Sequence, residues 1–174
     1  MSSGWRALIA DVPDFPKPGI VFKDITPVLA DPSAYRELNS ELCGPWVDAG
    51  ITHVVGVESR GFIFGTSMAQ QLDVGLVLVR KPGKLPRATR SVSYELEYGT
   101  DSLEIHVDDL KPGDRVLISD DVLATGGTAE ATAKLIAESG ATVVGFSFVI
   151  ELGFLSGRDR LADFGSVDSC LILE

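Results

Sequence analysis

The sequence predicts an α/β fold in which a central parallel sheet is flanked by helices. Two observations support this class. Short apolar runs rich in β-branched residues, which are typical of strands buried on both faces, recur at positions 53–57, 75–79, 116–118 and 142–150. Segments with helix-forming patterns, at 62–71 and 129–138, follow two of these runs. A chain of 174 residues suits one compact domain, so we expect residues 1–174 to form a single domain.

The composition is that of a globular protein. Hydrophobic residues make up 45% of the chain and charged residues 23%, and the net charge is −10. Such an acidic chain is poorly suited to nucleic acid or an anionic membrane, because these partners require broad neutralisation of phosphate charge. The first residues lack the basic region of a signal peptide, and no segment reaches membrane-spanning length. We therefore expect a cytoplasmic enzyme with no nucleic-acid or membrane partner.

The first thirty residues should contain little regular structure, because they hold four prolines, each of which removes a backbone donor. Within them, residues 19–27 are expected to form a short extended segment. A helix is predicted over 34–48, since Asp31 can cap its start and Pro32 is tolerated at the first helical position. The Gly-Pro pair at 44–45 should split that helix.

Polar residues follow the strand predicted at 53–57. Ser59 and Arg60 lie between this strand and the helix predicted at 62–71. Their side chains and the first helical amides should therefore meet at the carboxyl end of a strand, where an anion can bind. An arginine after a strand is, taken alone, more often a surface charge.

A basic stretch follows the strand predicted at 75–79. Residues 80–90 hold five of the fifteen basic residues and no acidic residue. For the stretch alone, a solvated loop is an equally good interpretation. In an acidic chain that also carries a phosphate site, local attraction of a small polyanion explains it better.

Apolar and polar residues alternate over 92–98 and again over 103–107, which predicts a β-hairpin. A hairpin that leaves a parallel sheet can close over a site and exclude water. Taken alone, Glu97 is more often a solvated strand residue. His106 is expected on the polar, solvent-facing side of the hairpin, with no evident partner.

The segment 116–128 combines a buried strand, two carboxylates, a glycine turn and a helix start. The strand should end at Asp120 and Asp121, whose carboxylates can accept hydrogen bonds from vicinal hydroxyls such as those of ribose. The following Thr-Gly-Gly-Thr lets successive amides converge on one anion, with Thr128 as the expected cap of the next helix. An acid pair or a glycine turn alone is a weak signal. Their combination is much more specific and predicts a ribose-phosphate site.

This segment resembles the phosphoribosyl-pyrophosphate signature of the type I phosphoribosyltransferases. Residues 123–128 are most similar to the branch that acts on adenine, and the resemblance extends over residues 15–173. It implies the type I fold, with a small hood formed largely by residues 1–30 and a flexible hairpin lid at about 84–107. Related enzymes hold a non-proline cis peptide that would fall near Glu58-Ser59.

The resemblance also implies a role for each group of site residues. The ribose and the 5′-phosphate of the donor would contact Asp120, Asp121, Ala124, Thr125, Gly126, Gly127 and Thr128. The pyrophosphate would contact Ser59, Arg60, Arg80, Lys81 and Lys84, of which Lys84 is the strongest expectation. The adenine would contact Val21, Phe22 and Lys23, although Phe22 taken alone is more often a core residue. Glu97 would exchange protons with the purine ring, and Tyr98 would belong to the lid.

The activity implied is transfer of the phosphoribosyl group to adenine, which yields AMP and pyrophosphate in purine salvage. Mg²⁺ would be the cofactor, held mainly by substrate and water, and the enzyme would be a homodimer. One alternative is a phosphoribosyltransferase for hypoxanthine, guanine or orotate. Another is a non-catalytic regulator that senses the donor or a purine. A nucleotide-binding dehydrogenase is less favoured, because no Gly-x-Gly-x-x-Gly follows the first strand.

Overall fold

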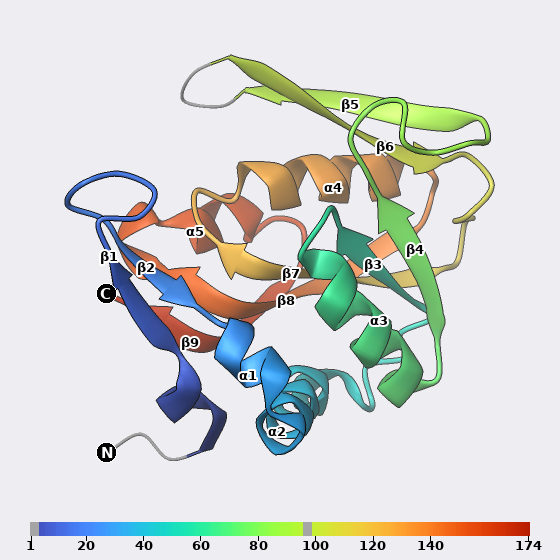
Figure 1. Ribbon diagram of the computed structural model, residues 1–174. Helices are drawn as coiled ribbons and strands as arrows, with labels where there is room; N and C mark the ends of the chain where they lie inside the picture. Colours follow the sequence, from blue (N-terminus) through green and yellow to red (C-terminus); the bar gives the residue numbers. More distant parts are fainter. Residues whose placement is uncertain (1–3, 96–98) are drawn as a thin grey trace. The chain divides into compact units, whose positions relative to one another are not determined.

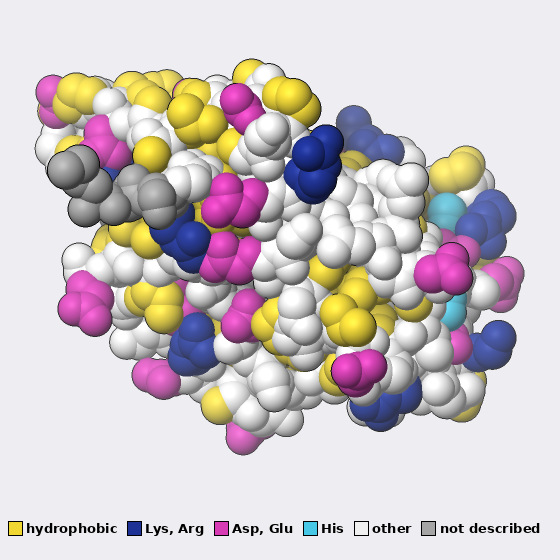
Figure 2. All heavy atoms as spheres, turned by 90° about the horizontal axis from the view of Figure 1, so that it is seen from below, with side chains coloured by type: hydrophobic (Ala, Val, Ile, Leu, Met, Phe, Trp, Pro, Cys, Tyr) yellow, Lys and Arg dark blue, Asp and Glu magenta, His cyan; other side chains and the backbone are white. Residues whose placement is uncertain are grey.

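The computed structural model describes residues 4–95 and 99–174. Contacts divide the chain into two compact units, Met1–Glu41 and Leu42–Glu174. No helix among the described residues is both long enough and apolar enough to cross a membrane. On the face shown in Figure 2, acidic and basic side chains lie interspersed, so this face does not present one broad basic surface among the described residues.

The first unit combines a small hairpin with short helices. Its elements are η1 (Gly4–Leu8), β1 (Ala10–Pro13), β2 (Val21–Asp24), α1 (Thr26–Ala30) and the start of α2 (Pro32–Cys43). Strands β1 and β2 pair antiparallel over four residues, so this region holds more regular structure than its prolines predict. Asp31 Oδ1 accepts hydrogen bonds from the N–H groups of Ser33 and Ala34, at 2.9 and 2.8 Å, which confirms the predicted helix start.

The second unit is built on a five-stranded sheet, shown in Figure 1, in the order β4-β3-β7-β8-β9. All neighbouring strands in it are parallel. The strands are β3 (His53–Val57), β4 (Gly75–Val79), β7 (Arg115–Leu123), β8 (Thr142–Leu152) and β9 (Ser166–Leu173). The predicted fold class is confirmed, and β3 and β4 have the predicted boundaries.

Strand β7 corrects one expectation. It does not end at the acid pair but continues to Leu123. The reason is that β8 is long enough to pair with it beyond that point, with Asp120 opposite Phe148 and Val122 opposite Ile150. The two carboxylates therefore project from a hydrogen-bonded strand and not from a turn.

Helices cover both faces of the sheet (Figure 1). The helical elements of this unit are η2 (Gly44–Trp46), α3 (Gly61–Leu72), α4 (Gly127–Glu138), η3 (Gly153–Leu155) and α5 (Gly157–Leu161). The main apolar core lies on the α4 side, where side chains such as Val55, Ile118 and Phe146 are fully buried. On the α3 side, Ser119 Oγ lies 3.4 Å from Met68 Sδ. The predicted break after α2 is confirmed by η2.

The predicted hairpin is present as β5 (Thr89–Glu95) and β6 (Thr100–His106), which pair antiparallel. Figure 1 shows it lying across α4. Leu103 and Ile105 are 1% exposed and join the core on the α4 side. The tip residues 96–98, which include Glu97 and Tyr98, lie outside the described residues.

Candidate active site

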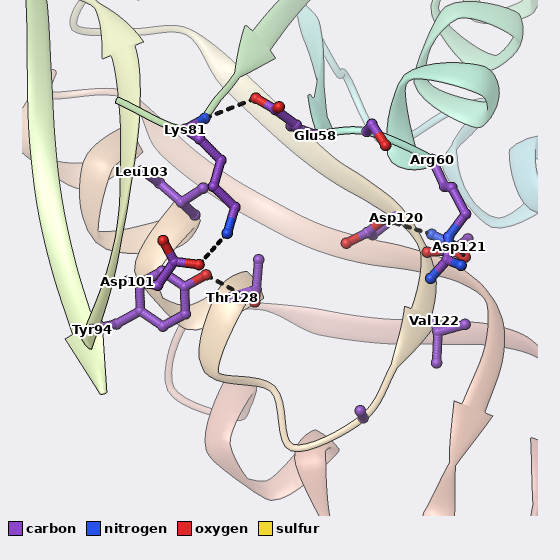
Figure 3. A pocket seen from close by; sticks show the side chains of 12 residues that line it. Glu58, Arg60, Lys81, Tyr94, Asp101, Leu103, Asp120, Asp121, Val122 and Thr128 are labelled. Carbon is purple, nitrogen blue, oxygen red and sulfur yellow. Dashed lines mark hydrogen bonds and ion pairs between the residues drawn. The ribbon is translucent and has the colours of Figure 1, made fainter. Parts of the chain in front are cut away.

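A cavity of about 540 Å³ lies at the carboxyl ends of β3 and β7. The loop after β3, the loop after β4, the hairpin and the segment 120–128 all contribute to its lining (Figure 3). In open α/β sheets, ligands bind outside the carboxyl ends of the strands. Of the predicted residues, the cavity brings together Ser59, Arg60, Lys81, Asp120, Asp121, Ala124 and Thr128.

The loop after β3 contains a cis peptide between Glu58 and Ser59, as the resemblance implied. Glu58 Oε2 accepts a hydrogen bond from the Lys81 N–H at 2.8 Å and forms an ion pair with Arg80 Nε at 3.2 Å. Glu58 thus ties the basic loop to the loop after β3. The sequence interpretation assigned no role to Glu58, because its partners lie more than twenty residues away.

Arg60 and Asp121 form an ion pair in which Nε and Oδ2 are 2.6 Å apart. The Asp121 side chain is 8% exposed, whereas that of Arg60 is 56% exposed. The sequence assigned these two residues to different parts of the donor, and the structure pairs them with each other. The pair neutralises a buried carboxylate and leaves the guanidinium accessible to a ligand.

Asp120 lies in the cavity beside Asp121, whose N–H donates to Asp120 Oδ1 at 2.8 Å. Burial and the adjacent charge of Asp121 raise the pKa of Asp120 well above its ordinary value. A protonated carboxyl group can donate a hydrogen bond to a hydroxyl, and an ionised carboxylate can accept one.

The loop between β7 and α4 lines a smaller cavity of about 90 Å³. Gly126 has a φ of +81° and is the N-cap of α4, so the helix begins at Gly127. This corrects the expectation that Thr128 caps the helix. Glycine adopts this backbone conformation without strain, so the turn can place the first helical amides at the edge of this cavity. The result is an open helix N-terminus suited to a phosphate group.

The start of α5 supports this loop from behind. A Cβ added to Gly157 would lie 2.2 Å from the Ala124 carbonyl oxygen, and one added to Gly126 would lie 2.8 Å from the Gly157 oxygen. The two backbone segments are therefore in direct contact. Sequence reasoning missed Gly157, because no local pattern links it to residue 126.

A second ion pair crosses the cavity from the hairpin to the basic loop. Lys81 Nζ pairs with Asp101, which lies opposite Tyr94 in the hairpin. Thr128 Oγ1 donates to the Tyr94 hydroxyl at 3.4 Å. Hairpin, basic loop and α4 are thereby linked inside the cavity (Figure 3).

The remaining predicted residues are placed as follows. Lys84 is exposed in the basic loop, and its N–H donates to the Lys81 carbonyl at 3.3 Å. Val21, Phe22 and Lys23 lie on β2 in the first unit. The Phe22 ring meets that of Phe15 edge to face with centroids 5.3 Å apart, and Lys23 Nζ pairs with Asp11 at 2.5 Å.

His106 corrects another expectation. It is 8% exposed and not solvent-facing. Its Nε2 accepts the Arg87 N–H at 3.3 Å, and its Nδ1 lies 3.1 Å from Asp109 Oδ2. The cause is that β6 ends against the loop that carries Arg87. His106 lines a separate cavity of about 410 Å³ beside β4.

Comparison with known proteins agrees with this geometry. The sequence model of the phosphoribosyl transferase domain matches residues 33–163. The adenine phosphoribosyltransferase of Anaeromyxobacter sp. (strain Fw109-5) is 58% identical over 90% of this chain and 88% of its own length. The crystal structure of adenine phosphoribosyltransferase from Rhodothermus marinus DSM 4252 has a TM-score of 0.91 and 55% identity, covering 97% of this chain and 96% of that one.

A third comparison concerns a ligand complex. Adenine phosphoribosyltransferase from Saccharomyces cerevisiae, solved with an imino-altritol bisphosphate and adenine, has a TM-score of 0.90 and 38% identity over 96% of both chains. Both the sequence and the whole fold are thus shared with these enzymes. This chain belongs to the phosphoribosyl transferase family, in the branch of the adenine phosphoribosyltransferases.

Proposed function

We propose that the cavity transfers the 5-phosphoribosyl group of phosphoribosyl pyrophosphate to adenine, which yields AMP and pyrophosphate in purine salvage. The observation that carries the proposal is that the cavity of the acid pair and the two cationic side chains shares Asp120, Ala124 and Thr128 with the smaller cavity at the open helix N-terminus. These groups match the ribose hydroxyls, the 5′-phosphate and the pyrophosphate of the donor.

The donor's sugar phosphate is held by β7 and the loop after it. Asp120 and Asp121 bind the ribose hydroxyls. The amides of residues 124–128 and the Thr125 and Thr128 hydroxyls bind the 5′-phosphate, which also meets the positive end of α4. This grip uses backbone groups fixed by the fold, so little reorganisation is needed when the donor binds.

The pyrophosphate leaves as the bond between it and the ribose C1′ breaks and a purine nitrogen bonds to C1′. Positive charge develops on the ribose and negative charge on the leaving group, so groups that bind these charges accelerate the reaction. Arg60 and Lys81 bind the leaving group, with Ser59, Arg80 and Lys84 as further contacts. The acid pair lies close to the developing ribose charge.

Adenine recognition rests on the family resemblance. Val21, Phe22 and Lys23 contact the base, with the Phe22 ring stacked on the purine. Glu97 takes the proton that the purine nitrogen releases, and such a group typically contributes 10²–10⁴ in rate. Tyr98 belongs to the lid that closes over the reacting groups.

Mg²⁺ is the proposed cofactor, and the donor set of the cavity fits it as a hydrated ion. Among the described residues, no group of three or more His, Cys, Asp or Glu is placed to hold a metal. Glu58, Asp120 and Asp121 do line the cavity, and Mg²⁺ retains water while binding phosphate oxygens. When bound, Mg²⁺ would neutralise pyrophosphate charge.

We further propose a cytoplasmic homodimer whose residues 1–174 form one catalytic domain, with a hood at 1–30 and a lid at about 84–107.

One assay tests the activity. Enzyme, Mg²⁺ and phosphoribosyl pyrophosphate are mixed separately with adenine, hypoxanthine, guanine and orotate, and pyrophosphate release is measured. We expect release with adenine. Turnover with another base but none with adenine would move the chain to another specificity, and donor binding without any turnover would favour a sensor.

A further inference from the structure

The two cations among the described residues that line the large cavity are Arg60 and Lys81, and each already has a carboxylate partner. The partner of Arg60 is Asp121, on a central strand of the sheet. The partner of Lys81 is Asp101, on the hairpin strand β6 (Figure 3). The leaving group must therefore compete with protein carboxylates for both cations.

The Lys81–Asp101 pair is the more exchangeable of the two. The Lys81 side chain is 50% exposed and that of Asp101 is 21% exposed, whereas Asp121 is 8% exposed. Partly exposed pairs contribute little free energy, so an incoming anion can replace the carboxylate. The Lys81 backbone stays anchored during such an exchange, because its N–H donates to Glu58 Oε2 at 2.8 Å.

Asp101 is held in place by groups other than Lys81. It accepts a hydrogen bond from the Ser102 N–H at 2.8 Å. It also lies opposite Tyr94 in the hairpin, and the Tyr94 hydroxyl accepts a bond from Thr128 Oγ1 at 3.4 Å. The bond to Lys81 lowers the pKa of Asp101 and raises that of Lys81, so both remain charged near neutral pH. A charged carboxylate thus stays beside the proposed leaving-group site whether or not Lys81 remains bound to it.

We propose that Asp101 is a positioning residue that sets the affinity for pyrophosphate, because it occupies Lys81 in the empty cavity and competes with the anion for it. This inference rests on the proposed use of Lys81 at the pyrophosphate site. The competition weakens the binding of product pyrophosphate and so favours its release. It also keeps Lys81 pointing into the cavity before the donor arrives.

The test is the affinity of the intact enzyme for pyrophosphate, with Mg²⁺ present, in an Asp101→Asn variant. We expect binding to become about tenfold tighter, because a competing charge and its repulsion of the anion are both removed. Asp108→Asn is the matched control, since Asp108 is exposed beyond the end of β6 and outside the cavity lining. It should change the affinity less than about twofold. Asp101→Ser serves as a second variant and should have the same effect as Asp101→Asn.

A double-mutant cycle with Lys81→Met separates the inference from the function on which it rests. We expect Lys81→Met to weaken pyrophosphate binding and to abolish the gain from Asp101→Asn. If Lys81→Met weakens binding but Asp101→Asn and Asp101→Ser leave it unchanged or weaker, the competition proposed for Asp101 is wrong. If Lys81→Met has no effect on binding, the proposed role of Lys81 itself is wrong.

Discussion

The two ends of the proposed donor site use different chemical groups, backbone at one end and charged side chains at the other. The 5′-phosphate end consists mainly of backbone, with the Thr125 and Thr128 hydroxyls as added donors: its loop has Gly126 at φ +81° and is supported by the backbone of Gly157. The pyrophosphate end is made of long side chains, Arg60 and Lys81, which are paired with carboxylates. We therefore expect the first end to be sensitive to added volume and the second to changes in charge. Four substitutions test this difference.

Gly157→Ala should have the largest effect. Its Cβ would lie 2.2 Å from the Ala124 carbonyl oxygen and 3.1 Å from the Gly126 nitrogen, which are backbone atoms that cannot rotate away. A loop shift of about 1 Å can cost about 100-fold, so we expect the donor dissociation constant to rise by roughly that factor. Gly44→Ala is the control, because nothing lies within 4 Å of its added Cβ. Equal donor affinity in both variants would contradict the support from α5.

Arg158→Met should weaken the ion pair that holds α5, the helix whose start supports the phosphate loop. Glu151 is 4% exposed and receives two bonds from the Arg158 guanidinium, at 3.0 and 2.5 Å, while a third goes to the Val167 carbonyl at 2.5 Å. The substitution leaves a buried carboxylate unpaired, and because Arg158 is partly exposed we expect a loss of about 2 kcal/mol in unfolding free energy.

Urea denaturation measures this loss. Arg160→Met is the matched control, since Arg160 pairs with Glu130 while 47% exposed and should cost less than about 1 kcal/mol. Equal losses in the two variants would show that the Glu151 pair has no special role.

Asp120→Asn should change the pH dependence of stability. The pKa of Asp120 is raised by burial and by Asp121, so its ionised form is disfavoured in the folded state. Stability from this group is therefore present below its unfolded pKa of about 3.9 and is lost as pH rises through the folded pKa. The melting temperature of Asp120→Asn should exceed that of the wild type by a margin that grows with pH above about 4. A margin independent of pH would contradict this.

The smallest effect is expected at Lys84. Lys84 is exposed in the basic loop, whereas Lys81 lines the cavity. Lys84→Met should therefore weaken pyrophosphate binding about threefold and Lys81→Met about tenfold, because solvent screens a charge outside the cavity lining more strongly from the bound anion. At low salt, Lys81→Met should cause the larger loss of pyrophosphate affinity. Both losses should shrink as ionic strength rises. A larger effect of Lys84→Met would indicate that the basic loop rearranges on binding.

The sequence predicted those features that depend on neighbouring residues. Strands β3 and β4 match their predicted ranges, because each is a buried apolar run with polar residues after it. The ends of β7 and the start of α4 were displaced, since pairing with β8 and the positive φ of Gly126 set them. The place of Ser59, Arg60 and the acid pair in one cavity was predictable, because each lies within three residues of the end of β3 or β7.

Features that depend on distant residues could not be predicted. Asp101 and Lys81 are twenty residues apart, and Gly157 meets a loop about thirty residues earlier. His106 lay in an alternating pattern that indicates exposure, yet the loop of Arg87 covers it. Each of these contacts is a product of topology, for which one sequence offers no local signal.

The contact between Gly126 and Gly157 also limits how such an enzyme can be redesigned. Neither glycine contributes a side chain to this contact, so any substitution at either position adds volume against backbone. The residues expected to meet the base lie more than a hundred positions earlier, on β2. A library confined to residues 19–27 would therefore test base preference without changing the contact between Gly126 and Gly157.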